Sequence, residues 1–106
     1  MTLPTGILVI AMLRLANDTG GFGAVLAKGD AQAGAILVVI GGAGDGDRLL
    51  ERGIGPDGGI ALIDSTPERD ITEYWQRRRR SDPDMWVIEL IGADAERFAA
   101  ETLIDD

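Results

Sequence analysis

Hydrophobic runs alternate with glycine-rich breaks along the whole chain. The first run, residues 7–16, is apolar nearly all round and is followed by an Asn-Asp-Thr-Gly-Gly stop. Its length and this stop predict a short buried helix, with a strand as the competing interpretation because the run contains several β-branched residues. Arg14 is its single charged residue, and we expect it to lie near the helix C-terminus and complement the helix dipole.

Four shorter apolar segments come next and are predicted to be strands. They occupy residues 22–27, 34–40, 48–52 and 60–63. The connection 28–33 is short enough for a hairpin between the first two, and the last two are predicted to be edge strands of an antiparallel sheet. The segment 41–47 lacks the residues of a phosphate-binding or calcium-binding loop, so we predict a turn there.

The segment 65–84 carries the signals of a second helix. Ser65 and Glu68 have the spacing of a capping box, so we expect Ser65 to cap this helix. An apolar stripe at helical spacing follows, formed by Ile71, Tyr74, Trp75 and the aliphatic stem of Arg78. Pro83 has a structural role, because the residue before a proline avoids the helical region and the helix must end there.

Residues 85–91 form the strongest predicted strand, with side chains that alternate between two faces. One face carries Met85, Val87, Glu89 and Ile91, and the other carries Trp86, Ile88 and Leu90. We assign Trp86 a structural role on the apolar face. Asp94 then stands where it can cap a last helix over about 95–102.

The predicted order is helix, four strands, helix, strand and helix. This order indicates an α+β fold, a small and mostly antiparallel sheet of about five strands with three helices packed mainly on one face. A length of 106 residues corresponds to a single domain, 1–106, with one core.

Charge and composition narrow the chemistry further. Ten lysine and arginine residues against 18 aspartate and glutamate residues give a net charge of −8, and the chain has neither histidine nor cysteine. It therefore lacks the usual general base, the thiolate nucleophile and the usual ligands of zinc, copper or iron. We expect no catalytic residue, no metal and no cofactor, and the acidic balance makes a nucleic-acid partner unfavourable.

The same composition favours the cytoplasm. A chain without cysteine needs no oxidising compartment, and no basic residue precedes the first apolar run as it would in a secretory signal. That run is also much shorter than the roughly 20 residues of a transmembrane helix. We therefore expect a cytoplasmic protein with no membrane contact.

One run of basic residues stands out as a candidate binding site. It comprises Arg77, Arg78, Arg79 and Arg80. Four guanidinium groups at one helix end could bind a phosphate, a nucleotide or an acidic partner. We favour the alternative that they stabilise the helix C-terminus, with Glu73 pairing to Arg77 and with Asp82 and Asp84 neutralising the others.

Three carboxylates, Asp82, Asp84 and Glu89, are the other candidate site residues. A divalent-metal-dependent hydrolase built on them is the least favoured hypothesis, because turn formation around the proline already explains both aspartates. Glu89 interrupts an apolar face and needs a partner, which we predict to be Arg14 or one of the arginines 77–80. A carboxylate with a raised pKa in a pocket is the functional alternative for Glu89.

The segment 78–89, RRRSDPDMWVIE, resembles the hallmark of the bacterial family called domain of unknown function 1491. In that family an arginine-bearing helix runs into a strand of this pattern. The first half of the chain is similar too, through the apolar helix ending in Arg14 and the segments GGFGAV, Gly29-Asp30 and AGAI at 33–36. The middle, from about 41 to 66, matches poorly.

Two positions depart from the family pattern. Ser81 stands where an aromatic residue is common, and Ile7 and Leu8 stand where a tryptophan often occurs. The resemblance implies a small stand-alone bacterial cytoplasmic domain, and it assigns no activity, cofactor or catalytic residue.

Taken from the residues, the leading hypothesis is a non-enzymatic protein-interaction module. We expect a homodimer formed through the apolar first helix or an exposed sheet edge, because a helix that is apolar on all sides needs more covering than a small sheet offers. An anion- or nucleotide-binding domain using the arginine run is the alternative from a different class.

Overall fold

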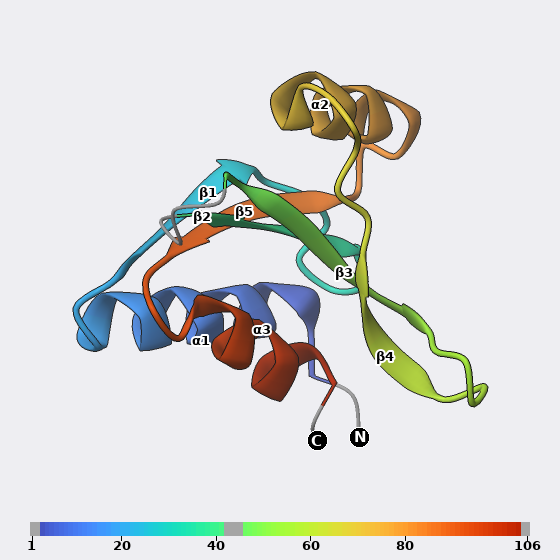
Figure 1. Cartoon of the computed structure of the whole chain (residues 1–106). Helices are drawn as coiled ribbons and strands as arrows, with labels where there is room; N and C mark the ends of the chain where they lie inside the picture. The colour runs from blue at the N-terminus through green and yellow to red at the C-terminus, as the bar shows by residue number, and fades with distance from the viewer. Residues whose placement is uncertain (1–2, 42–45, 105–106) are drawn as a thin grey trace.

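The computed structural model describes residues 3–41 and 46–104. Its elements in chain order are α1 (Thr5–Asp18), β1 (Phe22–Ala27), β2 (Ile36–Gly41), β3 (Arg48–Ile54), β4 (Ile60–Asp64), α2 (Ile71–Ser81), β5 (Trp86–Ile91) and α3 (Ala95–Leu103). This is the predicted order, and Figure 1 confirms the α+β fold. The first run is a helix and not the competing strand. Most of the turn predicted at 41–47 lies outside the described residues.

The strands form one mixed sheet in the order β1-β5-β2-β3-β4. Only the β2–β5 pair is parallel among the pairs of the described strands, so the sheet is mostly antiparallel as predicted. The predicted hairpin between β1 and β2 is wrong, because β5 lies between them. β5 has buried apolar side chains on both faces, and such a strand gains most from an interior position in the sheet. β4 is an edge strand as expected, whereas β3 is an interior strand.

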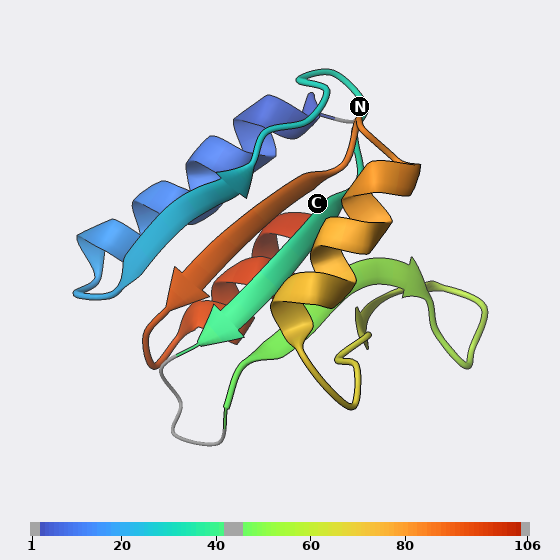
Figure 2. The same cartoon turned by 90° about the horizontal axis from the view of Figure 1, so that it is seen from above.

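Helices cover both faces of the sheet. α1 and α3 lie side by side against one face, and α2 lies over the other (Figures 1 and 2). The expectation that the helices pack mainly on one face therefore holds for two of the three. In the part of the chain described here, no helix is long and apolar enough to cross a membrane.

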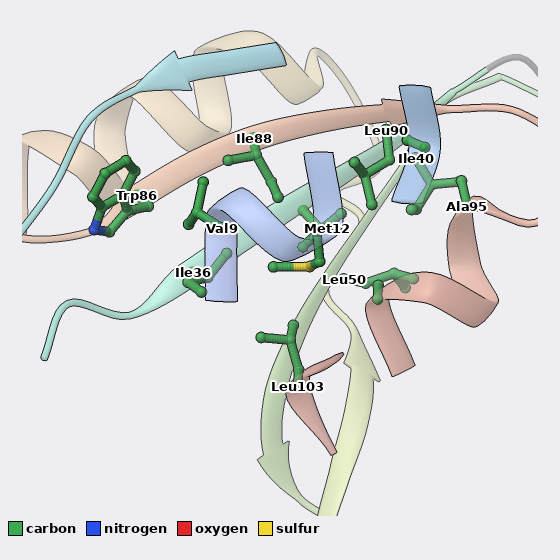
Figure 3. Packing of buried hydrophobic residues seen from close by; sticks show 13 residues of the cluster. Val9, Met12, Ile36, Ile40, Leu50, Trp86, Ile88, Leu90, Ala95 and Leu103 are labelled. Atoms are coloured by element: carbon green, nitrogen blue, oxygen red, sulfur yellow. The ribbon is translucent and has the colours of Figure 1, made fainter. Parts of the chain in front are cut away.

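The larger hydrophobic core lies between the sheet and the α1–α3 layer (Figure 3). Its buried members are Val9, Met12, Ala16, Ile36, Val38, Ile40, Leu50, Trp86, Ile88, Leu90, Ala95, Ala99 and Leu103. A smaller core under α2 consists of Leu37, Val39, Leu49, Met85 and Val87. The two faces predicted for residues 85–91 are confirmed, since alternate residues of this segment enter the two cores.

The helix ends differ from the predictions in three places. α2 begins at Ile71, and Asp70 is its cap, because the Asp70 side chain accepts a hydrogen bond from the Glu73 N–H at 3.0 Å. Ser65 is therefore not the cap, since the Asp-x-x-Glu pattern at 70–73 stands directly before the apolar stripe. α1 continues to Asp18, so Arg14 lies before its last turn. Asp94 does precede α3, but its side chain makes no capping hydrogen bond.

Candidate functional site

The segments that carry the family resemblance meet at one joint, where the loop 28–35 passes around the start of β5. The indole N–H of Trp86 donates to the Asp30 carbonyl at 2.7 Å, and the Asp30 N–H donates to the Asp84 carbonyl at 2.9 Å. A β-carbon on Gly29 or Gly34 would lie only 2.2 or 2.1 Å from that Asp84 oxygen. Backbone packing at this joint accounts for the glycines and the tryptophan of the motif without any chemistry.

The four consecutive arginines are not gathered around one binding site. Arg78 pairs with Glu51 of β3, with one nitrogen 3.0 Å from Oε1 and the other 2.5 Å from Oε2. Arg79 donates to the Lys28 carbonyl at 2.6 Å. Arg77 lies over the Tyr74 ring, 5.7 Å from its centroid, and Arg80 is exposed.

The Arg78–Glu51 pair connects α2 to the sheet. The two side chains are 30% and 21% exposed, and the Ser65 hydroxyl donates a further hydrogen bond to the same carboxylate at 2.5 Å. Burial raises the pKa of Glu51, but the hydrogen bonds from Arg78 and Ser65 and the arginine charge outweigh it and leave the pKa below its usual value. The hydrogen bond with Glu51 raises the pKa of Arg78. The pair is ionised at neutral pH.

Glu51 is the residue that sequence reasoning missed. It lies two positions after Leu49, so both side chains point to the α2 face of the sheet. Arg78 stands at the end of the α2 stripe and needs a carboxylate on that face. The signal was therefore present in the alternation of residues 49 and 51, but it required knowing that β3 lies beneath α2.

The prediction that Glu89 pairs with an arginine is wrong. Glu89 is half-buried on β5 between Ala24 and Val39, and none of the ion pairs found for residues 3–41 and 46–104 joins it to Arg14 or to an arginine of α2. Among the α2 arginines, Arg78 is paired with Glu51 instead. Because Glu89 is not fully buried, water can hydrate its carboxylate without a guanidinium partner.

The three candidate carboxylates are not brought together as metal ligands. Asp82 ends α2, and its side chain accepts a hydrogen bond from the Asp84 N–H at 3.2 Å. Glu89 lies further along β5. Within the described ranges no group of three such side chains is arranged to hold a metal ion. Asp82 and Asp84 were also predicted to neutralise the arginines of α2. Neither aspartate forms one of the ion pairs found among the described residues, and Arg78 pairs with Glu51 instead.

An apolar surface runs along α1 and β1 at one margin of the sheet, and we call it the α1–β1 surface. Figure 2 shows α1 following the same margin as β1. Ile7 and Ile10 of α1 are 50% and 49% exposed, and Val25 of β1 is 42% exposed on the same side of the sheet. Phe22, which begins β1 and lies on the opposite face of the sheet, is 50% exposed. Exposed apolar side chains gathered on adjacent elements are typical of an interaction surface.

A groove of about 430 Å³ lies within this surface. Ile7, Ile10 and Leu13 form its α1 wall, Val25 and Lys28 lie on the β1 side, and Trp86 also contributes. The opposite side of α1 carries Val9, Met12 and Ala16 into the core. The helix is thus apolar on both sides, as predicted, and the sheet covers only one of them.

The fold and these surfaces define a small α+β protein with a mixed five-stranded sheet and an exposed apolar margin. The family model described as "Protein of unknown function (DUF1491)" matches residues 3–100, and the chain belongs to this family. The resemblance seen in the sequence is confirmed. The family's description includes no activity.

Solved structures agree with this assignment. The chain is 38% identical to a DUF1491 family protein from Caulobacter crescentus CB15 in a crystal structure, with a TM-score of 0.78 over 92% of this chain and 94% of that chain. An NMR structure of a DUF1491 family protein from the same organism shows 39% identity and a TM-score of 0.74, over 92% and 93% of the two chains. A solution structure of an A. tumefaciens protein shows 26% identity and a TM-score of 0.74, over 100% and 98%. No curated protein matches the chain.

Proposed function

We propose that this protein is a non-enzymatic protein-interaction module that forms a homodimer through the α1–β1 surface. The observation that carries the proposal is the half-exposed pair of Ile7 and Ile10 on α1, with Leu3 at 54% exposure just before the helix. Ile7 and Ile10 are three residues apart, a spacing at which apolar side chains line one face of a helix. A stripe of large aliphatic residues left in water is stabilised when a second surface covers it.

Charge makes the α1–β1 surface the favoured contact between two identical acidic chains. The chain has a net charge of −8, so most pairs of surfaces on two copies repel each other. β1 contains no charged residue, and Arg14 and Asp18 are the charged residues of α1. Two copies can approach along this margin with little like-charge repulsion.

We place the module in the cytoplasm, a location supported by the cysteine-free sequence. The anion-binding alternative has weaker support, because Arg78 and Arg79 already have partners within the molecule. The groove beside Arg77 is lined by Arg69 and by three carboxylates, Glu68, Asp70 and Glu73, so negative side chains outnumber positive ones there.

Light scattering at micromolar concentration tests the proposed homodimer. We expect twice the monomer mass for the wild type and the monomer mass for the double variant Ile7→Glu/Ile10→Glu, since each buried carboxylate would lack a partner. Ile54→Glu is the matched control, because Ile54 is 67% exposed at the β3–β4 hairpin, away from this surface. A wild-type protein that is monomeric throughout would end the proposal.

A further inference from the structure

We infer that β1 is the pairing strand of this homodimer: the free edges of two β1 strands pair antiparallel, so that one sheet runs across both copies. This inference rests on the proposed self-association and specifies its geometry. β1 is an end strand of the sheet, and among the described strands it pairs only with β5. Its other edge offers backbone N–H and C=O groups to a further strand.

β1 lacks most of the features that normally keep an edge strand from pairing. Edge strands are protected by charged side chains, by proline, by short length or by β-bulges. β1 has six residues, Phe-Gly-Ala-Val-Leu-Ala, with neither charge nor proline, and its one irregularity is a register shift against β5 between Val25 and Ala27. The opposite edge strand, β4, differs because it is shorter and ends in Asp64, which lies 3.8 Å from Arg48. The edge with fewer of these protections is therefore the one beside the apolar groove.

Exposed apolar side chains lie on both faces of β1, which favours strand pairing over contact through α1 alone. Val25 lies opposite Ile88, which is in the α1-side core, and it lines the groove. Phe22 lies opposite Ile91 on the other face of the sheet and is 50% exposed. A contact between two α1 helices would leave Phe22 in water. A β1–β1 pair extends both faces, so it shields both side chains and satisfies the backbone groups.

Charge complementarity favours a second copy of this chain, in antiparallel orientation, as the partner that pairs with β1. The chain reverses at residues 19–21, so the end of β1 near Lys28 lies far from the end of α1 near Asp18. Antiparallel pairing of two copies brings Lys28, the single lysine of the chain, to the end of the other copy's α1. That end carries Asp18 and no basic residue in its last turn. A cation is favourable there.

Single-cysteine variants test this geometry, because the natural chain contains no cysteine. In an antiparallel pair, directly opposite Cα atoms are about 4.5–5.5 Å apart, within the range that a disulfide spans. Pairing over the full length of Phe22–Ala27 would place the two-fold axis beside Ala24 or Val25, so Ala24→Cys and Val25→Cys are both prepared. Ile54→Cys on the hairpin is the control. We expect at least one β1 variant to form a disulfide-linked dimer under mild oxidation, at concentrations at which the control stays monomeric.

Hydrogen exchange and light scattering on the cysteine-free protein separate the outcomes. Slow exchange of alternate β1 amides, becoming faster on dilution into the monomer, supports strand pairing. A dimer without disulfide formation at either β1 position and with fast β1 exchange overturns the strand pairing but leaves the proposed self-association standing. A monomer at every concentration overturns both.

Discussion

The α1–α3 side of the sheet and the α2 side hold their helices by different means. α1 and α3 each bury four residues, and neither has a side-chain capping hydrogen bond. α2 buries no residue fully, but it has the Asp70 cap and the Arg78–Glu51 ion pair. Burial of apolar side chains therefore stabilises the α1–α3 layer. In the α2 layer, a capping hydrogen bond and a half-buried ion pair supplement a small core.

This difference between the two layers predicts which substitutions should lower the free energy of unfolding most. Hydrophobic stabilisation is proportional to the apolar area removed from water, so it dominates the α1–α3 side. Capping hydrogen bonds and partly exposed ion pairs contribute less each. The α2 layer should therefore be the more weakly attached of the two.

The largest expected effect is the loss of a buried leucine from the larger core. Leu90 and Leu49 are both fully buried, on the α1–α3 side and the α2 side respectively. We expect Leu90→Ala to lower the free energy of unfolding by about 4 kcal/mol and Leu49→Ala by about 2–3 kcal/mol, because the thinner α2 layer relaxes more easily around a cavity. Urea denaturation measures both. Equal losses would show that the two layers pack equally well.

Breaking the ion pair should have a smaller effect. Arg78→Met keeps an aliphatic stem but leaves the half-buried Glu51 carboxylate without its cation, so we expect a loss of about 1–3 kcal/mol in the free energy of unfolding. Arg80→Met, at the exposed neighbour on α2, should change it by less than about 0.5 kcal/mol. If the two variants were equally stable, the pair would not be what holds α2 to β3.

Removing the helix cap should cost less again. Asp70→Ala deletes the acceptor for the Glu73 N–H, and we expect a loss of about 1 kcal/mol by thermal or urea unfolding. Asp70→Asn is the matched control, because asparagine also caps helices and tolerates the positive φ of 30° found at this position. Thr5→Ala is not a test of capping. The Thr5 hydroxyl donates a hydrogen bond to the Gly34 carbonyl, so this variant would measure the loss of a contact between α1 and the loop 28–35.

The smallest effect is a dependence of the ion pair on pH. The pKa of Glu51 is lowered in the folded state, so its contribution to stability is complete above the unfolded pKa of about 4.3 and is lost as the pH falls through the folded value. The difference in unfolding free energy between wild type and Glu51→Gln should therefore shrink between about pH 6 and pH 3. Asp64, whose pKa is also lowered, is present in both proteins and cancels. A difference that grows on acidification contradicts this assignment.

Much of the fold was predictable because its signals are local. The alternation in residues 85–91 and the stripe in residues 71–78 follow from the periods of strand and helix, and both are found. The capping error at Ser65 arose because two capping patterns stand five residues apart, at 65–68 and 70–73. Only the second adjoins the apolar stripe, and it is the one that α2 uses.

The site could be predicted only in part, because it depends on which distant segments become neighbours. The need of the α2 arginines for carboxylates was foreseeable. The expected partners were Glu73, Asp82, Asp84 and Glu89, whereas the one found is Glu51. Likewise the exposed apolar side of α1 was foreseeable from its composition. That β1 would lie at the sheet margin beside it was not, because β5 pairs between β1 and β2 from more than 40 residues away.

The amino-acid sequence by itself determined the type, order and approximate limits of the helices and strands, since these depend on side-chain period and nearby capping residues. Tertiary structure alone decided the strand order, the Arg78–Glu51 pair and the position of β1 beside the groove. The physical reason is that strand hydrogen bonds are nearly independent of side-chain identity. Competition among all apolar faces for burial therefore chooses which strand lies beside which.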